Sequence, residues 1–381
     1  MVLSLPFLLP SRLTYSVPYR FPGLRTIGLV FFLANIGLYI ILWVMILTRF
    51  YLYPYTFRAS FRHPTESLFI PAFAVSFGTI LINIVEYGTN HTGQWLTHAI
   101  LILFWFDAAL AFILSITIYL ILWSTQSFTI ARMTPIWIFP AYPLLIIGPH
   151  AAQLSSQNLS PHSSLQVIVG GFTIQGIGFL VSLTIYSAFV YRLMTQKLPS
   201  EPLRPGMFVS VGPSAFTVSG TVGMAFNIPT ILDSLNTKDY MGVPTPLASA
   251  ILTLIANWTC LWLWGLAFWF FFISLLSNIV CFRRSHHMPF SRTWFSFVFP
   301  QTALTNATFA IAKAFEMEAL KVVGCVMAGL LVLVWAGVVV MMVRAVVRKE
   351  LLWPEKGEDR SEGGFRMRKE EKEMTGDRVG P

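Results

Sequence analysis

Charged residues are scarce in this sequence. Only 11% of its 381 residues are Asp, Glu, Lys or Arg, whereas 55% are hydrophobic. Soluble domains carry roughly a quarter charged residues, so a soluble globular fold is excluded for most of the chain. The 33 Phe and 12 Trp are typical of a protein embedded in lipid, because aromatic rings fill both the bilayer core and its interfaces.

Cysteine is also rare. The three cysteines, Cys260, Cys281 and Cys325, lie in or beside hydrophobic runs, and no pair has the C-x-x-C spacing. This pattern excludes a disulfide framework and indicates no zinc site. We expect three small buried hydrophobic side chains, and we expect neither a metal ion nor a cofactor.

Catalytic motifs are missing as well. The sequence has no H-E-x-x-H, no P-loop, no G-x-S-x-G in a triad context and no paired intramembrane aspartates. We therefore predict that the chain is not an enzyme, and we assign no catalytic residue. The net charge of +9 does not indicate nucleic acid as a partner, because no basic stripe lies on a soluble domain.

Long hydrophobic stretches dominate what is present, and a spanning helix needs about 20 mostly apolar residues. Nine stretches qualify: 26–48, 67–87, 96–123, 133–153, 165–191, 206–227, 247–280, 294–315 and 322–347. They predict an all-α polytopic membrane protein whose transmembrane transporter domain covers 26–347. Residues 1–25 precede this domain, and the charged tail 348–381 is expected to be cytoplasmic and disordered.

Lys and Arg are divided unequally between the links that join these stretches. The links after the first, third, fifth and seventh stretches hold ten of them, and the alternate links hold three. The positive-inside rule makes the richer side cytoplasmic. The C-terminus is then inside, and we expect an integral protein of the plasma membrane.

Proline divides the stretches into two kinds that alternate strictly along the chain. The first, third, fifth, seventh and ninth stretches contain no internal proline; the others are broken by prolines, among them Pro71, Pro140, Pro143, Pro213 and Pro300. Proline in a helix removes one i→i−4 hydrogen bond, so Pro213 frees the carbonyl of Val209. Such carbonyls are tolerated at membrane depth only where protein or water satisfies them, which predicts broken helices inside the bundle and regular helices facing lipid. The alternative is that the prolines only kink ordinary helices.

Small and hydroxyl residues accompany one of these breaks. Gly212 and Ser214 flank Pro213, and Phe216 follows within one turn. We predict that these residues, with the prolines of the broken helices, line a transport conduit. Such a conduit binds the transported molecule only weakly, through dipoles. The ring of Phe299, directly before Pro300, could occlude this conduit or could belong to ordinary packing.

Ionisable residues within the stretches are few. Asp107, near the middle of a regular stretch, could relay a proton or contact a cation, or it could be a hydrogen-bonded carboxyl packed against a neighbouring helix. His150 ends the most proline-rich stretch and is expected to face an outer vestibule. His63 and Glu66 lie at a cytoplasmic helix start, where Glu suits the positive end of the helix dipole. With Arg204, they are predicted mouth residues.

Four motifs stand out: Phe21-Pro22-Gly23-Leu24, Pro135-Ile136-Trp137-Ile138-Phe139-Pro140, Arg204-Pro205-Gly206-Met207-Phe208 running into Val211-Gly212-Pro213-Ser214, and Trp294-Phe295-Ser296-Phe297-Val298-Phe299-Pro300. Together they resemble the tellurite-resistance/dicarboxylate transporter family, and its fungal malic acid transport branch in particular. Met342-Val343-Arg344-Ala345, followed by Trp353-Pro354, resembles the family's end. The resemblance covers roughly residues 20–360.

This resemblance implies a pore of ten helices arranged as five hairpins, of which the nine stretches here would supply all but the first helix. It implies a homotrimer with one pore in each subunit, and a phenylalanine gate at the position of Phe299. The implied substrates are small anions, most of all malate and other C4 dicarboxylates, with sulfite or inorganic anions as the alternative. A membrane receptor or scaffold that transports nothing is the alternative from another functional class. We expect residues 1–25 to be a remnant of the missing first helix.

Overall fold

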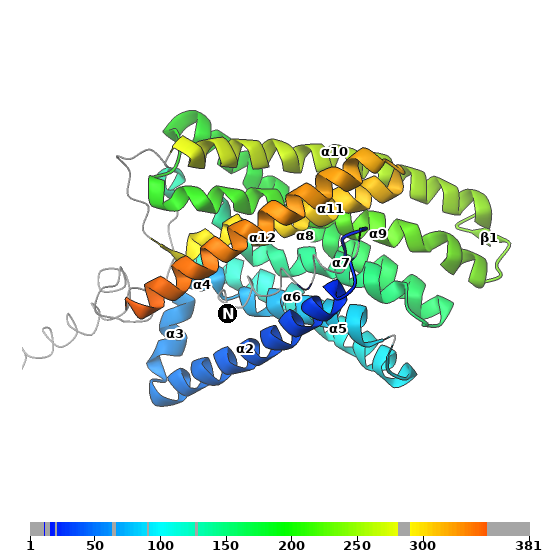
Figure 1. Cartoon of the computed structure of the whole chain (residues 1–381), viewed down its shortest axis with the longest axis horizontal. Coiled ribbons are helices and arrows are strands. Elements are labelled where there is room, and N and C mark those ends of the chain that lie inside the picture. Colours follow the sequence, from blue (N-terminus) through cyan, green and yellow to red (C-terminus); the bar gives the residue numbers. More distant parts are fainter. Residues whose placement is uncertain are drawn as a thin grey trace, which may run out of the picture.

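The computed structural model describes residues 11, 16–19, 21–62, 66–89, 91–125, 129–280 and 290–348. Five long helices without a break run through this part of the chain: α2 (Leu24–Leu52), α6 (Gln94–Thr125), α8 (Pro161–Gln196), α10 (Thr245–Ile279) and α12 (Glu318–Val347). In Figure 1, α10 lies along the upper edge of the bundle and α2 along the lower edge. These five helices are the regular stretches that the sequence predicts.

Four composite helices alternate with them along the chain. Each has a short first part and a longer α-helical second part: α4 (Glu66–Phe69) with α5 (Ala72–Gly88), η3 (Pro135–Ala141) with α7 (Tyr142–Ser155), η4 (Glu201–Val211) with α9 (Gly212–Ser234), and η6 (Arg292–Phe297) with α11 (Phe299–Ala314). The first part is a 3-10 helix in three of the four. In these three, the break predicted from proline is a change of helix type; in the first composite helix, it is an interruption between two α-helices.

Small elements connect the long ones. A short helix, α3 (Tyr55–Arg62), follows α2, and a single 3-10 turn, η2 (Ile130–Arg132), precedes η3. Strands β1 (Asp239–Tyr240) and β2 (Val243–Pro244) form an antiparallel pair between α9 and α10. The part of the chain that the structure describes is thus all-α apart from this hairpin.

Eight of the nine predicted stretches are helices long and apolar enough to cross a membrane, within the described residues. The stretch 294–315 differs, because Val298 separates η6 from an α11 of only 16 residues. Its shortness has a physical reason: Pro300 has no N–H to continue the ladder from η6, but it fits the first turn of a new helix.

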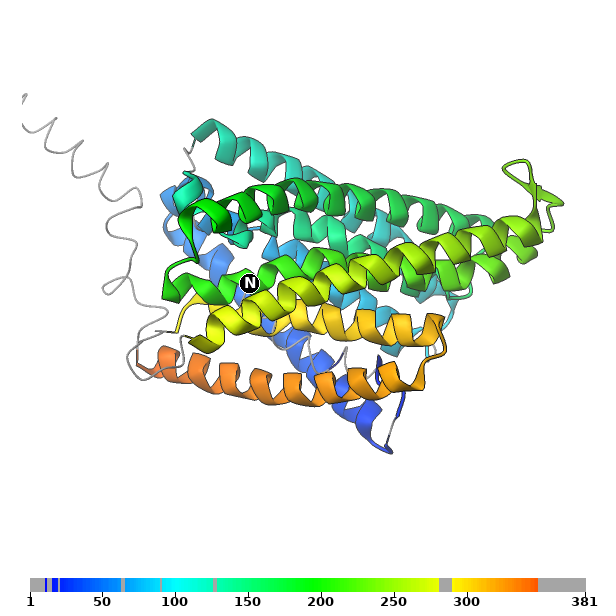
Figure 2. The same ribbon diagram turned by 90° about the horizontal axis from the view of Figure 1, so that it is seen from above.

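Burial separates the two kinds of helix. The most apolar windows of the first three composite helices are 72%, 94% and 50% buried, whereas those of the five regular helices are 17% to 33% buried. Helix α12 runs along one margin of the bundle (Figure 2). The prediction that broken helices lie inside the bundle is therefore confirmed for these three, and the regular helices are the more exposed ones.

The expectation for residues 1–25 falls largely outside the described residues. Ser11, which is described, is fully buried beside α5. It accepts a hydrogen bond from Asn83 Nδ2 at 3.2 Å, and its main-chain oxygen accepts one from the Tyr87 hydroxyl at 2.7 Å. Part of the N-terminal segment thus packs against the innermost face of the first composite helix.

Candidate functional site

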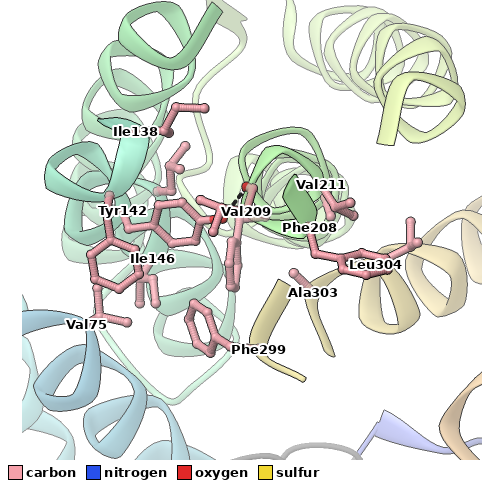
Figure 3. Packing of buried hydrophobic residues seen from close by; sticks show 14 of the residues in the cluster. Val75, Ile138, Tyr142, Ile146, Phe208, Val209, Val211, Phe299, Ala303 and Leu304 are labelled. Carbon is pink, nitrogen blue, oxygen red and sulfur yellow. Dashed lines mark hydrogen bonds between the residues drawn. The ribbon is translucent and has the colours of Figure 1, made fainter. Parts of the chain in front are cut away.

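Three aromatic side chains from three composite helices meet in the centre of the bundle. The ring centroids of Phe299 and Phe216 lie 5.4 Å apart, and the ring of Tyr142 lies 6.0 Å from each of them. Figure 3 shows Tyr142 and Phe299 facing each other across the space between their helices. We call these three residues the aromatic constriction.

The constriction extends toward the remaining composite helix. Phe139 stacks on Tyr142 with 5.1 Å between ring centroids, and Phe69 lies 5.4 Å from Phe139. Phe69 ends α4, so rings from all four composite helices join in one contiguous group. Phe299 is 8% exposed and Tyr142 is fully buried, so both rings lie in the packed interior.

The change of helix type places these rings. Tyr142 and Phe299 are the first residues of α7 and α11, and Phe216 is the fifth residue of α9. Each of these helices has a proline in its first two positions, where the missing N–H costs nothing. The α-helical parts of three composite helices therefore begin beside the constriction.

Tyrosines on the regular helices support the 3-10 segments. The hydroxyl of Tyr186 donates to the carbonyl of Ser210 at 2.6 Å, and that of Tyr119 donates to the carbonyl of Trp137 at 2.9 Å. Each carbonyl stands three residues before a proline, Pro213 or Pro140. In a 3-10 helix the partner of such a carbonyl is the nitrogen three residues later, and proline offers no hydrogen there.

The sequence analysis predicts that Pro213 removes the i→i−4 hydrogen bond to the carbonyl of Val209 and that protein or water satisfies this carbonyl. That prediction counts four residues back, as in an α-helix, but η4 is a 3-10 helix. The carbonyl of Val209 accepts from the N–H of Gly212 and also from the hydroxyl of Tyr142, at 2.5 Å (Figure 3). Protein groups satisfy the opened backbone, as burial at membrane depth requires.

Two glycines allow side chains to approach the composite helices closely. A Cβ atom added at Gly212 would lie 2.7 Å from Cζ of Tyr142. A Cβ at Gly148 would lie 2.9 Å from Cδ of Gln175, whose amide accepts from the N–H of Gly148 and donates to Oγ1 of Thr217 at 2.8 Å. The backbone of Gly212 has ordinary right-handed helical angles. Glycine fits this position because a larger side chain would collide with Tyr142.

The predicted lining residues are all buried in the interior. They are Pro71 at the start of α5, Pro140 and Pro143 at the junction of η3 and α7, Gly212, Pro213, Ser214 and Phe216 in the first turns of α9, and Pro300 in the first turn of α11. Of these, the structure brings Phe216 into the aromatic constriction with Phe299. Tyr142, the third member, is a residue that the sequence analysis missed.

The predicted mouth residues have different surroundings. Glu66 is the first residue of α4 and is half-buried, and His63 lies outside the described residues. The Arg204 guanidinium donates to the carbonyls of Pro199 and Ser277, at 3.1 Å and 3.2 Å, and so joins the start of η4 to the end of α10. Arg204 therefore connects η4 with the end of α10.

Asp107 and His150 form a buried pair away from the constriction. Oδ2 of Asp107 lies 3.5 Å from Nδ1 of His150, and the two side chains are 2% and 0% exposed. The edge of Phe104 packs against the imidazole, with 5.0 Å between ring centroids. The expectation that His150 faces an outer vestibule is wrong, because α7 turns this residue toward α6. Asp107 is packed against a neighbouring helix, as one of the two interpretations held.

Among the described residues, no three His, Cys, Asp or Glu side chains come together in a way that could hold a metal ion. Cys260 and Cys325 are free thiols, and Cys281 lies outside the described residues.

Comparison with known proteins points to one family. The family model described as voltage-dependent anion channel (SLAC1) matches residues 3–343. The malic acid transport protein of Schizosaccharomyces pombe is 30% identical over 348 residues, which cover 90% of this chain and 77% of that protein. A sulfite efflux pump of Trichophyton rubrum is 23% identical over 339 residues, covering 89% of this chain and 88% of the pump. An uncharacterised transporter of Methanocaldococcus jannaschii is 23% identical over 334 residues, covering 87% of this chain and 89% of that protein.

Proposed function

Because this chain belongs to the voltage-dependent anion channel family and is an anion transporter of that family, we propose that it moves malate and other C4 dicarboxylates across the plasma membrane. The family consists of transport proteins, which is consistent with the absence of catalytic motifs. The observation that carries the proposal is the meeting of Tyr142, Phe216 and Phe299 where three composite helices begin their α-helical parts.

The dipoles of these helices give the pathway its preference for anions. The α-helical parts α7, α9 and α11 begin beside the constriction, so the main-chain dipoles of three helix junctions lie there. An anion near the constriction would be stabilised by these dipoles and by main-chain N–H groups, without a fixed cation that would hold it too tightly. This weak attraction suits release as well as binding.

Phe299 is the gate in this proposal. Its ring contacts Tyr142 and Phe216 from the first residue of α11, directly after the break at Val298. A rotation of this side chain would open the constriction while the two other rings keep their places. Tyr142 is less free to move, because its hydroxyl is bonded to the carbonyl of Val209.

Malate is favoured as substrate by the relatives. A malic acid transport protein is more similar to this chain than the sulfite efflux pump is, and the difference extends over nearly the same length. Sulfite efflux is the second candidate, because that pump also matches most of the chain. By resemblance we further propose a homotrimer, and by the distribution of Lys and Arg a cytoplasmic C-terminus.

Flux measurements on purified protein in liposomes test the substrate. The proposal predicts uptake of labelled malate that excess unlabelled succinate competes away and that excess sulfite leaves largely intact. Liposomes without protein provide the control for passive leak. Movement of labelled sulfite without any movement of malate would contradict the substrate assignment and favour efflux of sulfite. Movement of none of the anions would contradict transport itself.

A further inference from the structure

One lysine lies on the interior side of a composite helix. Lys313 stands in the last turn of α11, 14 residues after Phe299. An α-helix has about 3.6 residues per turn and rises about 1.5 Å per residue, so Lys313 lies nearly four turns later, on the same face, and about 21 Å further along the helix. The face of α11 that carries Phe299 therefore ends in a full positive charge.

This face becomes more accessible toward its end. Phe299 is 8% exposed, Asn306 is half-buried, and Lys313 is exposed. Helix α9 shows the same change, because Phe216 is 9% exposed and Phe226, ten residues later, is 58% exposed. The space between α9 and α11 is thus closed at the constriction and open at the C-terminal ends of both helices. In the proposed orientation this end is the outer one.

The ammonium group of Lys313 rests on an aromatic ring of the neighbouring composite helix. Its Nζ lies 3.3 Å from the centroid of the Phe226 ring, which is a cation–π contact. Other sides of α9 are engaged elsewhere: the carbonyl of Ala225 accepts from α10, Thr217 bonds to α8, and Asn227 bonds to α7. Phe226 remains on the side toward α11, so the lysine reaches across the space between the two helices.

A lysine at a helix C-terminus has an ordinary explanation, which does not cover this geometry. A cation suits the negative end of the helix dipole, and a long side chain can carry its charge out to water. Lys313 instead turns inward onto α9. In the part of the chain that the structure describes, no acidic side chain pairs with it, whereas Lys321 on α12 pairs with Glu318 at 2.5 Å. The charge of Lys313 is therefore available to an anion.

Amide side chains accompany this end of the pathway. Gln153 of α7 and Asn227 of α9 each stand 11 residues, about three turns, after the constriction ring of their helix, so they share its face. Nε2 of Gln153 donates to Oε1 of Glu86 at 2.8 Å, and Glu86 is only 2% exposed. This carboxylate is thus hydrogen-bonded and shielded from a passing anion. The outer end is polar, and the lysine of α11 adds a full positive charge to it.

We propose that Lys313 is an anion-binding residue at the outer mouth of the pathway, where its ammonium group binds a carboxylate of the transported acid. The inference rests on the proposed function and adds to it a residue that sets the affinity for substrate. The ring of Phe226 covers one side of the ammonium group and leaves other N–H donors to the carboxylate. Because water and salt screen a single exposed charge, the binding is weak enough for release.

The first test is the concentration dependence of malate flux in liposomes. Lys313→Gln should raise KM about fivefold or more and change the maximal rate less than about twofold, because the charge acts on binding and not at the constriction. Lys313→Arg keeps the charge, so its KM should stay within about twofold of the wild type. The difference between Lys313→Gln and the wild type should shrink at high ionic strength. If sulfite is the anion that moves, its KM takes the place of that for malate.

Lys321→Gln is the matched control. Lys321 lies near the same end of the bundle in the first turn of α12, where it is paired with Glu318, outside the pathway. Its removal should leave KM unchanged.

Chemical labelling of the unaltered protein supplies a readout that needs no transport. Acetic anhydride modifies accessible lysines, and mass spectrometry follows the rate at each of them. Excess malate should slow the acetylation of Lys313 about threefold or more by occupying the site, and it should leave Lys321 unchanged. Dimethyl malate, which has no carboxylate, is the control ligand and should protect neither. Protection of Lys313 without flux of any anion contradicts the proposed function, not the binding site.

Three results would overturn the inference. They are a wild-type KM in a folded Lys313→Gln protein, a rise in KM of equal size in Lys321→Gln, and an acetylation rate of Lys313 that neither malate nor sulfite changes. The last needs no variant, so instability of the altered proteins cannot leave the question open.

Discussion

The hydroxyl of Tyr186 on α8 donates a hydrogen bond to the carbonyl of Ser210 in η4 at 2.6 Å. The carbonyl stands three residues before Pro213, at the place where a 3-10 helix meets a nitrogen without hydrogen. The same tyrosine ring packs on Phe270 of α10, with 4.6 Å between centroids. One side chain of an outer helix thus fixes an inner helix at its break.

Tyr186→Phe should destabilise the protein through this single bond. The ring and its contact with Phe270 remain, and a buried carbonyl loses its side-chain donor, which costs about 1–3 kcal/mol. Thermal unfolding in detergent should show the loss as a lower midpoint. Tyr191→Phe, an exposed tyrosine of the same helix, is the control and should leave the midpoint unchanged. Equal midpoints for both variants would contradict the role of the bond.

Gly212→Ala should displace Tyr142 or destabilise the junction of η4 and α9. The added Cβ would lie 2.7 Å from Cζ of Tyr142, much closer than van der Waals contact. Overpacking of this kind costs about 1–3 kcal/mol. Gly265→Ala on α10 is the control, since an added Cβ there meets nothing within 4 Å.

The control should be neutral or slightly stabilising, because alanine favours a helix by up to about 1 kcal/mol over glycine. Unfolding midpoints of the two variants decide the matter. If Gly212→Ala is as stable as Gly265→Ala, Tyr142 can move aside without loss of stability. That result would contradict the claim that Gly212 is needed for close packing against Tyr142.

Gln175→Leu should loosen the contact of α8 with α7 and α9. The buried amide accepts from the N–H of Gly148 at 3.1 Å and donates to Thr217 at 2.8 Å, and leucine can replace neither bond. The expected loss of unfolding free energy is about 1–3 kcal/mol. Gln166→Leu changes an exposed glutamine of the same helix and should have no such effect in the same unfolding assay. A loss of equal size in both variants would argue against the bridge.

The sequence predicts the large features of the fold because proline acts locally. Pro71, Pro140, Pro213 and Pro300 each lie at or beside the junction of a composite helix, so the alternation of broken and regular helices is predictable from their positions. Burial follows from the same reasoning, since an opened backbone needs partners that lipid does not supply. The expectation of broken helices inside was confirmed for this reason.

The contacts between helices could not be predicted in this way. Asp107 and His150 are on different helices, and their meeting depends on how α6 and α7 are rotated about their axes. The position of Pro213 also does not reveal that the segment before it is a 3-10 helix, in which the carbonyl opposite the proline nitrogen is that of Ser210. Tyr142 was missed for a related reason: nothing in the sequence around it indicates that its ring faces Phe299.

The most direct test of the account is basal anion flux through Phe299→Ala in liposomes, compared with Phe297→Ala. Phe297 lies two residues earlier and packs on Phe208 and Trp294, outside the aromatic constriction. If Phe299 closes the pathway, its removal should raise malate flux about tenfold or more, equivalent to about 1.4 kcal/mol off the barrier, and Phe297→Ala should stay near the wild-type rate. A folded Phe299→Ala protein with wild-type flux would contradict the gate.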